Sequence, residues 1–188
     1  MEVVNLKKTI SKIIDIVLIV LIIFLSFRLL QQRGIIKTKV GKMEEIPSFT
    51  VEDVSGEEIT DRIFKDYDLT IVTVWSTSCG ACFNQLEALN KLYKDFQNGN
   101  INIIGVVTSG ERKIEEVKEI SGDMGLQFLN LIPNKEFNKD FVKGVVGTPT
   151  TLFVDENGKI LDISTGSYGT EGDIEFLSNK VNELLNKE

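Results

Sequence analysis

Residues 69–82 read LTIVTVWSTSCGAC, in which an apolar, β-branched run leads directly to Cys79 and Cys82, the only two cysteines of the chain. The run at residues 69–75 predicts a buried β-strand. Apolar side chains then recur at helical spacing, at Leu86, Leu89, Leu92, Tyr93 and Phe96. The two cysteines therefore lie at a strand-to-helix junction, with the C-x-x-C spacing of dithiols that make and break disulfides.

The place of Cys79 at the predicted helix start gives the two thiols different roles. Free backbone amides at a helix N-terminus carry partial positive charge, which favours a thiolate over a thiol. Because the thiolate is the nucleophile in disulfide exchange, we predict that Cys79 attacks the substrate. Cys82, one turn further into the helix, then attacks the mixed disulfide and resolves it.

Three other interpretations of the cysteines are weaker. A structural zinc site needs about four ligands, and this chain has two cysteines and no histidine, so we predict no metal and no cofactor. Covalent haem attachment would need a histidine directly after Cys82, where Phe83 stands. A static structural disulfide stays open as an alternative, although so short a loop would constrain the unfolded chain little.

A second motif lies at residues 147–151, GTPTT, which precede an apolar strand at 152–154 and a turn at 155–158. With the W-x-x-x-C-x-x-C core, this segment resembles the thioredoxin superfamily, and within it the membrane-anchored TlpA/ResA-like thiol–disulfide oxidoreductases. The resemblance implies an α/β, thioredoxin-like fold with a central mixed sheet flanked by helices on both faces. It also implies a cis Thr148–Pro149 bond beside the dithiol, with Thr148 presenting its backbone to the substrate.

The resemblance covers about residues 46–185 and fails at two positions. The family often has a glutamate three residues after the second cysteine, where this chain has Gln85, and thioredoxin buries an aspartate at the position of Thr73. Without either carboxylate we expect slower or more alkaline-dependent turnover. Glu87, the nearest acid, is expected to be an ordinary solvated helix charge. Trp75 is expected to pack beside the active-site loop.

Gly80 and Ala81, between the cysteines, influence the reduction potential. No lysine, arginine or histidine lies between or directly beside the cysteines to stabilise a thiolate strongly. A reducing couple is therefore favoured over a strongly oxidising one.

The N-terminal segment differs from the rest of the chain. Residues 13–30 are almost wholly apolar and, as a helix, would extend roughly 27 Å, enough to span a bilayer. We predict a tail at 1–12, a transmembrane anchor at 13–30, a juxtamembrane tether at 31–45 and a thioredoxin-like domain at 46–188. A cleaved signal peptide is the alternative, but no small-x-small cleavage site follows the apolar stretch.

Charge divides at the same boundary. Residues 1–43 hold eight of the 21 Lys and Arg and two of the 28 Asp and Glu, which leaves 13 basic and 26 acidic residues in 44–188. So acidic a domain disfavours nucleic-acid binding. Positive charges flank the apolar stretch almost evenly, so orientation rests on the resemblance, which implies a single-pass protein of the cell membrane with an extracytoplasmic catalytic domain.

The leading function is a membrane-tethered reductase or isomerase of exported protein disulfides, with apocytochrome c among the substrates of some family members. Expected partners are protein disulfides and thiols and a membrane electron donor, and the domain is expected to be monomeric. One alternative is a peroxiredoxin-type peroxidase, although Ser76 stands where that chemistry favours threonine. The other is a redox-sensing binding module without turnover.

The remaining pattern predicts the scaffold around the dithiol. A continuous apolar run at residues 101–107 indicates a strand buried on both faces. The other predicted elements are a hairpin at 49–60, helices at 114–120, 135–142 and 173–185, and strands at 127–132 and 159–164.

Overall fold

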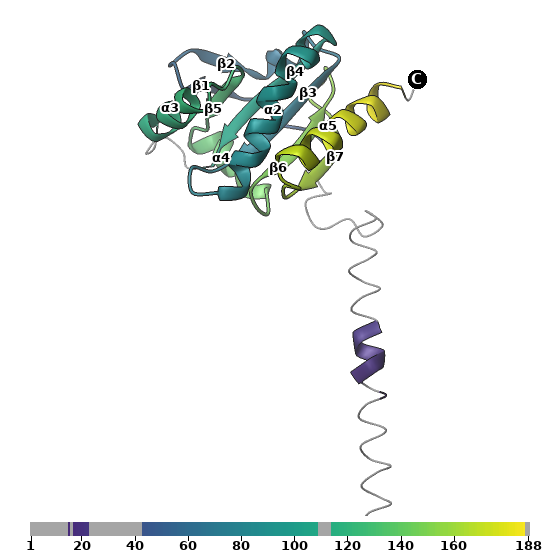
Figure 1. The fold of residues 1–188 in the computed structure, drawn as a ribbon. Coiled ribbons are helices and arrows are strands. Elements are labelled where there is room, and N and C mark those ends of the chain that lie inside the picture. Colours follow the sequence, from purple (N-terminus) through teal and green to yellow (C-terminus); the bar gives the residue numbers. More distant parts are fainter. Residues whose placement is uncertain (1–14, 16, 23–42, 109–113, 187–188) are drawn as a thin grey trace, which may run out of the picture. The chain divides into compact units, whose positions relative to one another are not determined.

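The computed structural model describes residues 15, 17–22, 43–108 and 114–186. Within residues 43–186 the chain forms a seven-stranded mixed sheet in the order β2-β1-β5-β4-β3-β6-β7 (Figure 1). The strands are β1 (Thr50–Asp53), β2 (Glu58–Thr60), β3 (Leu69–Trp75), β4 (Ile101–Val107), β5 (Leu129–Ile132), β6 (Thr150–Val154) and β7 (Ile160–Thr165). The helices are η2 (Asp61–Phe64), α2 (Gly80–Asn98), α3 (Ile114–Asp123), α4 (Lys135–Asp140), η4 (Val142–Gly144) and α5 (Thr170–Leu185).

The centre of the sheet is buried on both faces. Every side chain of β3, β4 and β6 is buried. β3 runs parallel to β4 and antiparallel to β6. Strands covered on both sides need near-continuous apolar runs, which explains why their sequences do not alternate. The predicted strands at 69–75 and 101–107 are confirmed.

Helices cover both faces, as the α/β prediction requires. The first core packs α2, α3 and α5 on one face, through side chains such as Leu86, Val117 and Leu177. The second core lies on the opposite face and includes Phe64 of η2 and Phe137 of α4. In Figure 1, α2 and α5 lie next to each other on the same side of the sheet. The thioredoxin-like arrangement expected from the sequence is therefore present.

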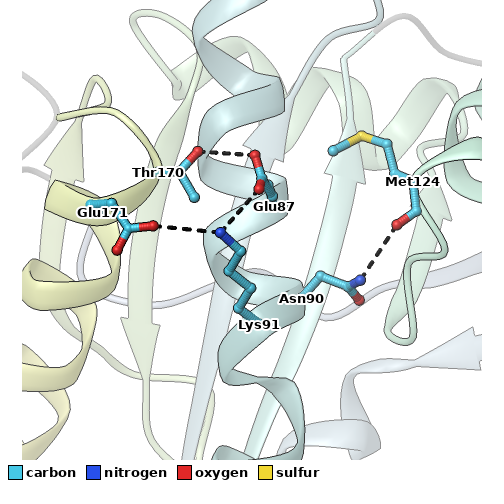
Figure 2. Close-up of polar contacts among 6 residues, drawn as sticks. All are labelled: Glu87, Asn90, Lys91, Met124, Thr170 and Glu171. Atoms are coloured by element: carbon cyan, nitrogen blue, oxygen red, sulfur yellow. Dashed lines mark hydrogen bonds and ion pairs between the residues drawn. The ribbon is translucent and has the colours of Figure 1, made fainter.

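Polar side chains join α2 to its neighbours on the outer surface (Figure 2). Lys91 forms ion pairs with Glu87 at 3.0 Å and Glu171 at 3.5 Å, and Thr170 donates a hydrogen bond to Glu87. The bond from Lys91, followed by that from Thr170, lowers the pKa of Glu87. Glu87 is the exposed helix charge that the sequence predicted. Asn90 donates to the carbonyls of Met124 and Gly125, which anchors the end of α3 to α2.

Three helix boundaries differ from the predicted ones. α4 ends at Asp140 rather than at Val142, where the separate 3-10 helix η4 begins. α3 does not end at residues 121–122 but continues to Asp123, and the chain turns at Gly125, whose φ of +59° suits glycine. α5 starts at Thr170 rather than Asp173. The Asp173 carboxylate accepts a hydrogen bond from the backbone N–H of Tyr168, in the turn before the helix. Asp173 therefore lies within the first turn of α5 and is not its first residue.

Of the predicted anchor, the structure describes residues 15 and 17–22, which are helical. The side chains from Val17 to Ile22 are 52–60% exposed, and all six are apolar. The tail at 1–12, the rest of the anchor and most of the tether lie outside the described residues. Among those that are described, no helix has both the length and the apolar character to cross a membrane. Glu44 and Glu45 pair with the chain at residues 159–160.

Candidate active site

Cys79 and Cys82 form a disulfide at the junction of β3 and α2. Cys79 is the N-cap of α2, and its sulfur accepts a hydrogen bond from the backbone N–H of Cys82 at 3.2 Å. Cys79 is half-buried, whereas Cys82 is fully buried. A substrate can therefore reach the first sulfur but not the second, which is the asymmetry that an attacking and a resolving thiol need.

The loop before the helix holds Cys79 at the surface. The backbone N–H of Cys79 donates to the carbonyl of Ser76 at 3.0 Å, and the hydroxyls of Ser76 and Ser78 lie 3.1 Å apart. Gly80 and Ala81 are both exposed. The peptide between the cysteines is therefore open to a partner.

The second predicted motif lies at the same edge of the sheet. The Thr148–Pro149 bond is cis, as the resemblance implied. Thr150 is paired with Val74, one residue before the end of β3, so the loop containing Thr148 and Pro149 lies at the end of β3 that leads to Cys79. The carbonyl of Pro149 accepts a hydrogen bond from Gly166 at 2.8 Å, which joins this loop to the one after β7.

Two exposed apolar side chains border this loop. Val146, just before it, is 71% exposed, and Tyr168, in the loop after β7, is 67% exposed. The ring of Tyr168 rests on Phe176, with centroids 5.5 Å apart. We call Val146 and Tyr168 the apolar rim. Sequence reasoning missed it, because only the pairing of β6 with β7 brings the two loops together.

Asp173 fixes the loop that carries Tyr168. This carboxylate is buried and accepts hydrogen bonds from the Ser167 hydroxyl at 2.5 Å and from the Tyr168 backbone N–H at 2.9 Å. A buried charge is tolerated only when hydrogen bonds compensate it. The loop therefore has a defined position beside Pro149.

Trp75 is fully buried, in the core cluster that also contains Cys82. Its indole N–H donates to the side-chain oxygen of Asn130 at 2.9 Å. Gly105 of β4 makes room for this bond, since a methyl group there would overlap the Asn130 oxygen and lie 3.0 Å from the indole nitrogen. The sequence signal for this contact was a single glycine within a mostly apolar strand.

Thr73 and Gln85, which stand where the family has carboxylates, are hydrogen-bonded to each other. The Thr73 hydroxyl donates to Oε1 of Gln85 at 2.7 Å, and both side chains are buried. Gln85 follows Cys82 by one helical turn. The two positions beneath the dithiol, Thr73 and Gln85, therefore carry neutral, hydrogen-bonded side chains instead of acidic ones.

Other features do not join the dithiol. In the described part of the chain, no group of three or more His, Cys, Asp or Glu side chains is placed to hold a metal ion. An open cavity of about 610 Å³ is lined by residues that include Phe49, Arg62 and Phe137, but by neither cysteine nor Pro149.

Comparison with known proteins agrees with this geometry. Residues 43–163 match the model of the AhpC/TSA family. The chain is 28% identical to thioredoxin-like protein YneN of Bacillus subtilis over 162 residues, which covers 86% of this chain and 92% of the relative. It is 31% identical to the thiol-disulfide oxidoreductase ResA of Geobacillus thermodenitrificans over 137 residues, covering 72% of this chain and 75% of that one.

A solved structure shows the same fold. A thiol:disulfide interchange protein from Bacteroides sp. superimposes with a TM-score of 0.63 at 26% identity, over 76% of this chain and 89% of the other.

Proposed function

Because the chain belongs to the AhpC/TSA family and is a thiol–disulfide oxidoreductase, we propose that it is a membrane-tethered reductase or isomerase of exported protein disulfides. The observation that carries this proposal is the pairing of a half-buried Cys79 at the helix N-cap with a fully buried Cys82. Only the first sulfur is available to a large substrate.

The proposed reaction uses both thiols in turn. The Cys79 thiolate attacks one sulfur of a substrate disulfide, and the other substrate sulfur leaves as a thiolate and takes a proton from water. Cys82 then loses its proton and attacks Cys79, which forms the internal disulfide and releases the second substrate thiol. Two electrons pass to the substrate, and a membrane electron donor returns two electrons to the dithiol.

The apolar rim supports a protein substrate. Val146 and Tyr168 border the Pro149 loop, where an extended segment next to a substrate cysteine would lie. Solvent-exposed apolar side chains beside a reactive group are typical of a surface that binds a partner. An apocytochrome c with an oxidised C-x-x-C-H segment is one candidate, since that segment must be reduced before haem attaches.

The membrane tether is supported by composition. Residues 13–30 are almost wholly apolar, and the part of them that the structure describes is helical with its apolar side chains exposed. Exposure of this kind is stable in lipid and unfavourable in water. We place the catalytic domain on the extracytoplasmic side, where protein disulfides form.

The test compares protein and small-molecule disulfides. The full chain in detergent is reduced and mixed with a disulfide-containing protein or with oxidised glutathione. We expect Tyr168→Ser to slow reduction of the protein several-fold and to leave glutathione reduction unchanged. Leu161→Ser is the matched control, because Leu161 is an exposed apolar residue of β7 outside the apolar rim.

Four results would oppose the proposal. Wild-type protein that consumes peroxide but does not reduce protein disulfides would favour a peroxidase. Equal slowing of protein disulfide reduction by Tyr168→Ser and Leu161→Ser would contradict substrate binding at the apolar rim. Extraction of the full chain from membranes by carbonate, or protection of its domain from protease in intact spheroplasts, would contradict the anchor or the orientation.

A further inference from the structure

A row of neutral residues crosses the sheet directly beneath α2. Thr73 of β3 is paired with Gly105 of β4 on one side and with Thr151 of β6 on the other. Directly paired residues share a face of the sheet, and Thr73 contacts Gln85 of α2, so these positions face the dithiol helix. Thr73, Thr151 and Gln85 are all at most 2% exposed. These three side chains are therefore shielded from bulk water, whereas the side of the dithiol at Cys79 is partly open to it.

The side-chain amide of Gln85 uses its oxygen in a hydrogen bond, but not its nitrogen. Its oxygen accepts from the Thr73 hydroxyl, but its nitrogen has no hydrogen-bond acceptor among the described residues. The amide nitrogen is therefore available to a partner that forms when the disulfide opens.

Helix geometry identifies Cys82 as that partner. Side chains in a helix lean towards its N-terminus, so a residue lies over the one three positions before it. Cys82 precedes Gln85 by three positions, and both are buried on the face of α2 that packs on the sheet. With the disulfide closed, the Cys82 sulfur is bonded to Cys79. Once the disulfide opens, the Cys82 sulfur is a thiol, which must ionise before it can attack Cys79.

We propose that Thr73 orients Gln85 so that its amide N–H groups donate to the Cys82 thiolate during resolution, in place of a carboxylate that would accept the Cys82 proton. Gln85 contacts the reacting sulfur, and Thr73 is a positioning residue. This inference rests on the proposed dithiol chemistry. The Cys82 proton passes to water, the thiolate attacks Cys79, and the amide donor keeps its own protons throughout.

Other charges near Cys82 are directed elsewhere. β3, β4 and β6 contain no titratable side chain. On α2, Glu87 and Lys91 pair with each other at the outer surface. On α5, Glu171 pairs with Lys91, and Asp173 accepts from Ser167 and the backbone of Tyr168. The Gln85 amide is thus the polar group best placed to set the ionisation of Cys82.

The experiment titrates Cys82 by itself. In a Cys79→Ser background, the full chain in detergent has one thiol, and the ultraviolet absorbance of its thiolate is followed against pH. We expect Thr73→Val or Gln85→Leu to raise the midpoint by about one unit, a tenfold change in the ionisation equilibrium. Thr73→Ser keeps the hydroxyl and should keep the midpoint.

Thr151→Val is the matched control. Thr151 lies opposite Thr73 and is equally buried, but its hydroxyl has no hydrogen-bond partner in the described structure, so its loss should not move the midpoint. An unchanged midpoint in both Thr73→Val and Gln85→Leu, or an equal rise in Thr151→Val, would overturn the inference. The titration needs no substrate, so its result is independent of the proposed function. The midpoint can stay unchanged in the variants while the wild-type chain reduces protein disulfides, and it can shift in the variants while the wild-type chain does not reduce them.

Discussion

Cys79 and Cys82 differ in exposure although only two residues separate them. The helix start turns Cys79 towards the surface and Cys82 into the core, where it packs with the apolar side chains beneath α2. The C-x-x-C spacing and the strand before it predicted the strand-to-helix junction and different roles for the two thiols, but not their difference in burial. The assignment of attack to Cys79 and of resolution to Cys82 follows from their burial as much as from the helix N-terminus.

Trapping experiments test that division directly. Cys82→Ser should accumulate mixed disulfides between Cys79 and substrate proteins, because no thiol remains to resolve them. Cys79→Ser should trap almost none, since the remaining sulfur is buried. Both variants are compared on non-reducing gels after acid quenching. Trapping by Cys79→Ser to the same extent as by Cys82→Ser would reverse the assignment.

At the level of elements, β3, β4 and β5 are joined behind the dithiol by Trp75, Gly105 and Asn130. Gly105→Ala would push a methyl group into the Trp75–Asn130 hydrogen bond. We expect a loss of about 2–4 kcal/mol in the free energy of unfolding, measured by urea denaturation. Gly99→Ala is the control: its nearest atoms would be about 3.5 Å away, so its effect should stay within about 0.5 kcal/mol.

The turn between β1 and β2 gives the fold a dependence on pH. Burial opposes ionisation of Asp53, but hydrogen bonds from the Ser55 hydroxyl and from the backbone of Glu57, Ser55 and Gly56 outweigh it and lower the pKa of Asp53. A carboxyl whose pKa is lower when folded stabilises the protein above its unfolded pKa. That contribution disappears as the pH falls through the folded pKa.

Asp53→Asn should therefore destabilise the domain by about 1–2 kcal/mol near neutral pH. The difference from wild type should shrink below the ordinary aspartate pKa of about 3.9. Urea denaturation at a series of pH values measures it, with Asp66→Asn, an exposed position, as the control. A difference that stays constant as the pH falls would contradict the argument.

Sequence reasoning reached the elements but not the contacts between them. It predicted the strands at 69–75 and 101–107 and the helix after Cys79, because each has a local signal, whereas the cis bond at Pro149 was implied by the family resemblance. It could not pair Thr73 with Gln85, Trp75 with Asn130, or the Val146 loop with Tyr168. Those contacts depend on strand register across the sheet, which residues 69–82 do not encode by themselves.

At the scale of the whole molecule, the dithiol belongs to a domain of net negative charge. Residues 44–188 carry 26 acidic and 13 basic side chains out of the totals of 28 and 21. No lysine, arginine or histidine lies between or directly beside the cysteines, and the Cys79 sulfur accepts a hydrogen bond from the backbone N–H of Cys82. The thiolate of the reduced form is thus weakly stabilised, and a weakly stabilised reduced form gives electrons away more readily.

We therefore expect a reduction potential closer to the value of about −270 mV for thioredoxin than to the value of about −120 mV for DsbA. Equilibration of the full chain in detergent with a dithiol buffer of known potential measures it. Ala81→His places a titratable cation near the half-buried Cys79 and should make the couple more oxidising below the histidine pKa of about 6.5, whereas Ala81→Gln should not. A wild-type value near that of DsbA would show that the protein introduces disulfides rather than reduces them.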